Sequence, residues 1–105
     1  MWNFKIYEIN KEIQSKNMNI LITGSAGFIG FHTAFKLLQN KHPVIGIDSI
    51  NNYYDVGLKK KRLHLLKEKY KKTFIFYKTD ISNKKKILNL FKKHKIHKVI
   101  NLAAQ

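Results

Sequence analysis

The sequence predicts an α/β fold in which helices cover both faces of a doubly wound parallel sheet. Short apolar runs alternate with helix-compatible segments along the chain from Met18. Neighbouring runs are separated by segments that fit single crossover helices, and such connections make the strands parallel. The runs are nearly continuous in apolar residues, as expected of strands that are buried on both faces.

Four strands and three helices are expected in the order β-α-β-α-β-α-β. The strands are predicted at residues 19–23, 44–48, 74–78 and 99–102, and the helices at 28–40, 56–70 and 84–94. Pro43 suits a strand start, and Ser82 or Asn83 suits a helix N-cap. The expected spatial order is 3-2-1-4, the first four strands of a Rossmann-type sheet. In that arrangement the last strand is an exposed, mostly apolar edge.

Residues 1–17 do not follow this pattern, and we expect an N-terminal extension that is disordered or weakly helical. The spacing of Ile6, Ile9 and Ile13 suits one weak helical face. Met18 opens the first strand, and residues 18–105 are expected to form the N-terminal part of the Rossmann domain. Our hypothesis is that Met18 is the ancestral start. A native protein whose N-terminus lies seventeen residues upstream, by mass spectrometry, would count against it.

Composition restricts the class of protein. The chain has 105 residues, of which 44% are hydrophobic, with one proline and no cysteine. This is typical of one small globular domain, and it excludes disulfides and Cys-based zinc sites. No apolar run approaches the roughly 20 residues that cross a bilayer. Glu8 and Glu12 interrupt the N-terminus, unlike a signal peptide. We expect a cytoplasmic protein without a membrane partner.

The formal net charge of +15 raises the question of a nucleic-acid partner. Eight of the 21 basic residues lie within residues 59–72 and seven within residues 84–98. In both blocks the lysines alternate with apolar residues at helical spacing, as on the solvated faces of amphipathic helices. Nearly all are Lys rather than Arg, which binds phosphate in a bidentate manner. We therefore expect no nucleic-acid partner.

Three glycines between the first strand and the first helix indicate a phosphate site. Gly24 allows a sharp exit from the strand, Gly27 lets the helix N-terminus approach a pyrophosphate, and Gly30 permits close helix packing. The N–H groups of Phe28 and Ile29, at the positive end of the helix dipole, would hold the phosphate charge. The alternative is a structural turn that binds nothing.

Acidic residues at two strand ends indicate the adenosine side of that site. Asp48 lies 18 residues beyond Gly30, where a carboxylate accepts bonds from the ribose hydroxyls and favours NAD over NADP. No Arg or Lys occurs in the ten residues after Asp48. Asp80 could bind the adenine amino group, with Ile81 packed on the ring, or it could cap the following helix. We favour the adenine contact.

The five histidines show no grouping that would bind a metal, so we expect no metal site. His94 and His97 are three residues apart at a helix end without an acidic neighbour, and both are expected in solvent.

These motifs resemble those of a known family. The stretch Thr23–Gly30 resembles the Gly-x-x-Gly-x-x-Gly fingerprint of the extended short-chain dehydrogenase/reductase family. The loop Asp48–Val56, continuing to Leu58–Lys59 and Arg62–Leu63, is similar to the strand-two loop of UDP-glucuronate 4-epimerases, although Ser49 and Asn52 replace the usual Asn and Asp. Asn101–Gln105 matches the motif after strand four.

The resemblance extends the NAD site and implies an activity. It adds Asn51, Leu102, Ala103 and Ala104 to the cofactor-binding residues. It implies that the full-length relative is a homodimer that uses NAD to oxidise a UDP-sugar transiently at carbon 4. The catalytic Tyr-x-x-x-Lys pair and its Ser or Thr partner are expected downstream of Gln105, so no catalytic residue is assigned. The alternatives are a nucleotide-sugar 4,6-dehydratase and a truncated product that binds NAD without catalysis.

Overall fold

The computed structural model describes residues 5–8, 19–50 and 56–103, which form five strands and three helices. The strands are β1 (Lys5–Glu8), β2 (Ile20–Thr23), β3 (Val44–Asp48), β4 (Phe74–Lys78) and β5 (Lys98–Asn101). The helices are α1 (Phe28–Gln39), α2 (Val56–Lys69) and α3 (Lys84–Lys93). The strands predicted at 44–48 and 74–78 have the predicted bounds. The strand predicted at 99–102 is shifted by one residue, and the other predicted elements differ by one residue at one end.

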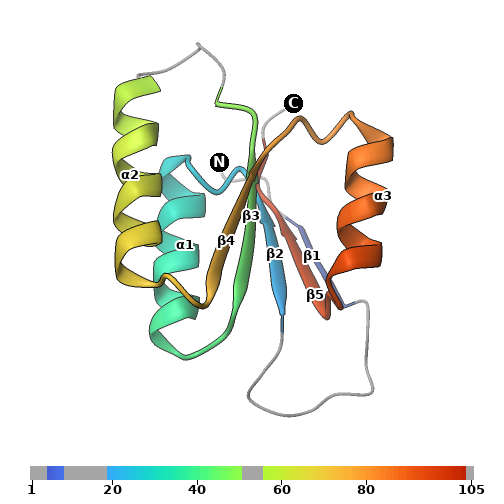
Figure 1. Cartoon of the computed structure of the whole chain (residues 1–105), viewed down its shortest axis with the longest axis horizontal. Coiled ribbons are helices and arrows are strands. Elements are labelled where there is room, and N and C mark those ends of the chain that lie inside the picture. Colours follow the sequence, from blue (N-terminus) through green and yellow to red (C-terminus); the bar gives the residue numbers. More distant parts are fainter. Residues whose placement is uncertain (1–4, 9–18, 51–55, 104–105) are drawn as a thin grey trace.

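The sheet has the order β1-β5-β2-β3-β4 (Figure 1). Read from the other edge, the four strands that were predicted follow one another as β4-β3-β2-β5, which confirms the predicted order 3-2-1-4. These four strands are parallel, with Ile20 of β2 level with Val44 of β3 and with Lys98 of β5. Parallel strands end at the same edge of a sheet, so the residues that follow β2, β3, β4 and β5 gather at one edge.

Helices α1 and α2 cover one face of the sheet, and α3 covers the other (Figure 1). Ile20 and Ile22 pack with the buried side chains of α1 and α2, whereas Leu21 packs with Leu90 of α3. Successive residues of β2 therefore enter two separate cores. This explains why the strand is a continuous apolar run rather than an alternating one.

Strand β1 is the main difference from the prediction for residues 1–17. Lys5–Glu8 are neither helical nor disordered; they pair antiparallel with β5. The prediction that the last strand is an exposed edge is also wrong, because β1 covers it. The physical reason is that the free backbone edge of β5 offers hydrogen bonds to an adjacent extended segment. The rest of the predicted extension and Met18 lie outside the described residues.

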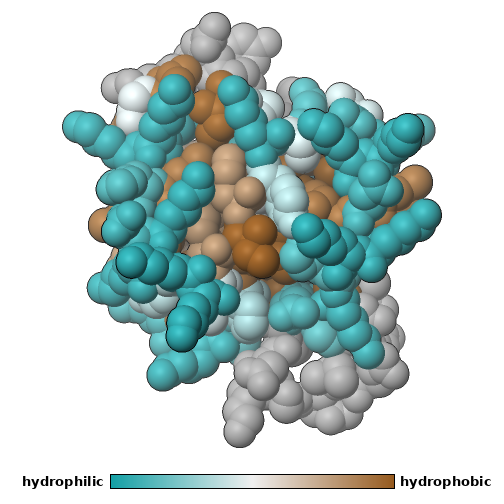
Figure 2. All heavy atoms as spheres, in the orientation of Figure 1, coloured by the Kyte–Doolittle hydropathy of each residue, from teal (hydrophilic) through white to brown (hydrophobic). Residues whose placement is uncertain are grey.

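The surface charge follows the expected pattern with one exception. Hydrophilic side chains flank the molecule over α2 and α3, with a hydrophobic strip between them over β4 (Figure 2). Ile75 of β4, an edge strand, is 42% exposed. The exception is Lys59 of α2, which is only 9% exposed. Its helix neighbour Leu58 is exposed instead.

The prediction that His94 and His97 lie in solvent is wrong. His97 is buried, and its Nδ1 accepts a hydrogen bond of 3.0 Å from the backbone N–H of Asn19. His94 is half-buried, and its Nε2 lies 2.8 Å from the hydroxyl of Tyr77. Both rings are held by residues distant in sequence, which a local pattern does not indicate.

Within the described ranges, no helix is both long and apolar enough to cross a membrane.

Candidate functional site

In the turn between β2 and α1, Gly24 and Gly30 have different structural roles. Gly24 has a φ of +77°, which few residues other than glycine adopt, and the chain leaves the strand sharply there. The N–H groups of Gly24 and Ser25 both bond the carbonyl of Ile47, at 2.8 and 3.1 Å, which ties the turn to β3. A Cβ on Gly30 would lie 1.9 Å from the carbonyl oxygen of Gly24, so the helix packs on the turn only with glycine there.

The N-terminus of α1 is open to an anion. Gly27 is the N-cap, and no side chain among the described residues caps it. The first helical bond runs from the N–H of Phe31 to the carbonyl of Gly27, at 2.8 Å. The preceding N–H groups, of Phe28 and Ile29, belong to the first turn, where helix geometry supplies no acceptor. The first turn also carries no acidic side chain. These two donors are where the sequence predicts the pyrophosphate.

Asp48, at the end of β3, is the residue that the sequence predicts on the adenosine side. Asp48 is only 7% exposed. Oδ2 accepts the N–H of Ala26 at 2.9 Å, and Oδ1 accepts the N–H of Ile50 at 2.8 Å. The ammonium of Lys59 lies 3.5 Å from Oδ1. The carboxylate therefore connects the glycine turn, the loop after β3 and helix α2.

Lys59 and Arg62 belong to the candidate site by their contacts, although the sequence analysis assigned neither of them a role there. Arg62 Nη1 donates to the carbonyl oxygen of Ala26 at 3.0 Å, and its guanidinium carbon lies 5.9 Å from the ring centroid of Phe28. A signal was present, because these two cations fall at i and i+3 on the face that also presents Leu63 and Leu66 to the core. The expectation that the lysine-rich face is wholly solvated concealed it.

The ends of β2 and β5 are joined by Thr23. Its hydroxyl accepts the N–H groups of Leu102 and Ala103, at 3.1 and 3.2 Å, and donates to the side-chain oxygen of Asn101. A Cβ on Gly24 would lie 3.0 Å from the backbone of both Leu102 and Ala103. Two of the residues predicted from the resemblance thus border the glycine turn.

Asp80 and Ile81 lie in the turn between β4 and α3, and both are exposed. Asp80 Oδ1 accepts the N–H of Ser82 at 2.9 Å, and this bond lowers the pKa of the Asp80 carboxyl. The N-cap of α3 is Asn83, one of the two predicted candidates, whose Oδ1 accepts the N–H of Lys86 at 3.2 Å. Asp80 therefore shapes the turn without being the cap.

The structure brings most of the predicted residues to one edge of the sheet. The N–H of Thr79 bonds the carbonyl of Asp48 at 3.1 Å, which sets the start of the Asp80 turn beside the end of β3. Asn51 and Ala104, two further predicted cofactor residues, lie outside the described residues.

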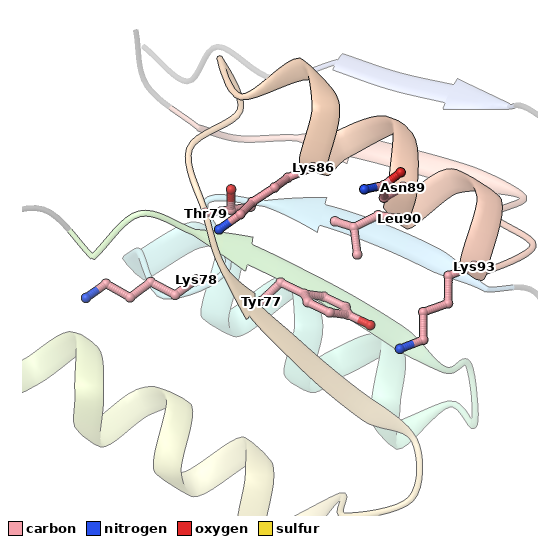
Figure 3. A pocket seen from close by; sticks show the side chains of 7 residues that line it. All are labelled: Tyr77, Lys78, Thr79, Lys86, Asn89, Leu90 and Lys93. Carbon is pink, nitrogen blue, oxygen red and sulfur yellow. The ribbon is translucent and has the colours of Figure 1, made fainter.

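A separate hollow lies between β4 and α3 on the opposite face from α1 and α2 (Figure 3). It measures about 270 Å³, and the ring of Tyr77 and the side chain of Leu90 face each other across it. Thr79, Lys86, Asn89, Lys93 and Lys78 complete its lining. None of the predicted cofactor residues lines this hollow.

The fold and the glycine turn together define a Rossmann-type α/β domain of the extended short-chain dehydrogenase/reductase class. A family model described as GDP-mannose 4,6 dehydratase matches residues 21–105, and the chain belongs to this family.

Individual relatives carry more specific names. Protein CapI of Staphylococcus aureus is 49% identical over 88 residues, which are 84% of this chain and 25% of the relative. A UDP-glucuronate 4-epimerase of Thermodesulfobacterium geofontis is 42% identical over 85 residues, which are 81% of this chain and 26% of the relative. This chain thus spans about a quarter of the length of these relatives.

A solved structure gives the same match in three dimensions. The UDP-glucuronic acid 4-epimerase of Bacillus cereus, in complex with UDP-glucuronic acid and NAD, superimposes with a TM-score of 0.70 and 35% identity. The match covers 83% of this chain and 26% of that protein.

Proposed function

We propose that this chain forms the adenosine- and pyrophosphate-binding part of an NAD-dependent nucleotide-sugar 4-epimerase that acts on a UDP-uronate or a related UDP-sugar. The observation that carries the proposal is the N-terminus of α1, which no side chain of the described residues caps and which the glycine turn places beside the buried Asp48 carboxylate. The relatives that are named UDP-glucuronate 4-epimerase, and the NAD present in one solved structure, support the same function.

The residues present fit the dinucleotide. The N–H groups of Phe28 and Ile29 would hold the pyrophosphate, because a helix N-terminus attracts negative charge. The position of Gly27 is compatible with close approach, because it presents no Cβ toward the phosphate. We assign the adenine side to Asp80 and Ile81. We also assign Leu102 and Ala103 to the cofactor site, together with Asn51 and Ala104, which lie outside the described residues.

Asp48 has acceptor capacity left for a ribose hydroxyl. A carboxylate offers about four lone-pair positions, and the N–H groups of Ala26 and Ile50 and the ammonium of Lys59 occupy three of them. The negative charge disfavours a 2′-phosphate, so NAD should be preferred. Lys59, the eleventh residue after Asp48, moderates this preference for NAD because its positive charge lies beside the carboxylate.

When bound, NAD supplies the redox chemistry, while the protein supplies binding and orientation. The acid–base pair of the reaction is expected downstream of Gln105. A cytoplasmic location and a homodimer of the whole enzyme belong to the same proposal.

Calorimetric titration of the chain with NAD and with NADP tests the proposal. NAD should bind more tightly by about tenfold, the effect expected of roughly 1.4 kcal/mol of differential charge interaction. Equal affinity would contradict the role of Asp48, and the absence of NAD binding would contradict the site. Incubation of the chain with UDP-glucuronate and NAD should give no turnover, and measurable epimerisation would refute our placement of the acid–base pair.

The second candidate is a nucleotide-sugar 4,6-dehydratase, which is favoured by the description of the matching family model. Product analysis of the enzyme that contains this domain separates the two functions. An epimerase returns a sugar with the inverted 4-hydroxyl, whereas a dehydratase releases water and a 4-keto-6-deoxy sugar. A third possibility, an NAD-binding product without catalysis, predicts NAD binding without any downstream acid–base pair.

A further inference from the structure

The carbonyl and the N–H of Ala26 are held from two different elements. Asp48 Oδ2 at the end of β3 accepts the N–H at 2.9 Å, and Arg62 Nη1 of α2 donates to the carbonyl at 3.0 Å. Ala26 is fully buried, so a carbonyl without this partner would have little access to water. The N–H of Gly27, which belongs to the same peptide group as the Ala26 carbonyl, bonds the carbonyl of Gly24 at 3.1 Å. Both peptide groups that flank Ala26 are therefore fixed.

This peptide group determines how the chain enters α1. Gly27 is the N-cap, with φ −73° and ψ 173°, and its own carbonyl accepts the first helical bond. A rotation of the Ala26–Gly27 peptide changes φ of Gly27 and redirects the first turn. The N–H groups of Phe28 and Ile29 follow directly, so their direction depends on the bond that Arg62 makes.

We infer that Arg62 is a positioning residue of the dinucleotide site, which acts through the Ala26–Gly27 peptide to aim the N–H groups at the start of α1. The inference rests on the proposed function and adds to it a residue on α2 that is absent from the glycine motif. Arg62 also places its guanidinium 5.9 Å from the ring centroid of Phe28, the first residue of the helix. One side chain thus contacts both sides of the helix start.

Arginine suits both contacts. Its planar guanidinium has five N–H donors, so it can bond a carbonyl while its face lies near an aromatic ring. Lysine keeps the charge and can make one bond, but it lacks the planar group. Methionine has a similar apolar stem and neither property. Lys61 is an exposed neighbour on the same helix, so Lys61→Met removes one positive charge without this contact.

A purely structural link between α1 and α2 makes a different prediction. It would change the stability of the whole domain and leave the affinity of the folded chain for ligand unaltered. A positioning role changes the affinity for ligands that contain the diphosphate and spares those that lack it. The discriminating comparison is therefore ADP-ribose against adenosine, with NAD as the complete ligand.

The test uses Arg62→Met, Arg62→Lys and Lys61→Met in the full chain. In the free proteins, amide hydrogen exchange at Gly27 should accelerate about tenfold in Arg62→Met relative to Lys61→Met, the effect of losing one charge-assisted hydrogen bond. Exchange at Leu66, in the core of α2, should not differ between them. In titrations, Arg62→Met should bind NAD and ADP-ribose about tenfold more weakly with little change for adenosine, and Arg62→Lys should fall between it and the wild type.

Two results would overturn the inference. One is unchanged exchange at Gly27 in Arg62→Met. The other is acceleration of Gly27 and Leu66 together, with a ligand affinity of the folded protein equal to that of Lys61→Met. If the wild-type chain binds no NAD, the proposed function fails, and exchange at Gly27 alone decides whether Arg62 holds the turn.

Discussion

The Asp48 carboxylate shows how much a single residue's position in the sequence predicts. Its place at the end of the second predicted strand predicted a polar residue beside the glycine turn, and the buried carboxylate does bond the N–H of Ala26 in that turn. Its contact with adenosine stays a prediction. Its partner Lys59 was not predicted, because the bond depends on the rotation of α2 relative to β3, which is set by the packing of Leu63 and Leu66. Arg62 was missed for the same reason.

Substitution of Lys59 tests how the charge near Asp48 is balanced. Lys59→Met should increase the ratio of NAD affinity to NADP affinity, because the carboxylate would then act on a 2′-phosphate without a compensating cation. Calorimetric titration with both dinucleotides measures the ratio. The exposed Lys60→Met serves as the control, and a ratio that changes equally in both variants would argue against a local effect.

Substitutions at two glycines of the turn should affect the stability of the domain and its NAD affinity differently. Gly30→Ala should lower the free energy of unfolding by about 3 kcal/mol, the upper end of the usual cost of overpacking, because its Cβ would meet the Gly24 carbonyl. Gly27→Ala should alter stability by less than about 1 kcal/mol, since its Cβ would have no neighbour closer than 3.4 Å. Gly27→Ala should nevertheless weaken NAD binding. Urea denaturation and titration measure the two effects; a Gly30→Ala chain as stable as the wild type would refute the packing argument.

His94 predicts a pH dependence of stability. Its pKa is lowered from the usual 6.5, chiefly because burial disfavours the charged form, with a smaller contribution from Lys93. Below pH 6.5 the unfolded chain binds more protons at this site than the folded chain, so the free energy of unfolding should decrease until the folded-state pKa is passed. Urea denaturation between pH 7 and 5 should show a shallower decrease for His94→Gln. The same slope in wild type and variant would contradict this, and the exposed His64→Gln is the control.

At the scale of the elements, the predictable parts are those whose signals are local. The strands β3 and β4 have the predicted bounds because Pro43, Asp48 and the aromatic run Phe74–Tyr77 mark them clearly. Strand β1 could not be predicted, because four residues acquire strand structure only by pairing with β5, ninety or more positions away. At residues 5–8 the isoleucine spacing favoured a helix, whereas the structure has a strand there.

Removal of β1 tests its role at the sheet edge. A chain that begins at Met18 should have a lower urea midpoint and should self-associate at concentrations where the full chain does not, because the backbone edge of β5 is then exposed. Light scattering and denaturation together check this. An equally stable, monomeric variant would show that the pairing contributes little.

At the scale of the whole molecule, the two-sided sheet and the strand order were predictable because right-handed crossovers leave few alternatives. The matched relatives are about four times as long as the matched segment, so the activity of a whole enzyme stays a proposal. The glycine turn, Asp48 and Arg62 meet at one edge of the sheet, and the hollow between β4 and α3 lies apart from them.

The most direct test is to map the amide signals of the chain by NMR during titration with NAD. We predict that the largest shifts fall on Phe28 and Ile29, with smaller ones at Asp48 and Ile81, while Asn89 and Lys93 beside the hollow stay unchanged. Shifts confined to Asn89 and Lys93, or none at all at saturating NAD, would contradict the assignment of the dinucleotide site to the N-terminus of α1.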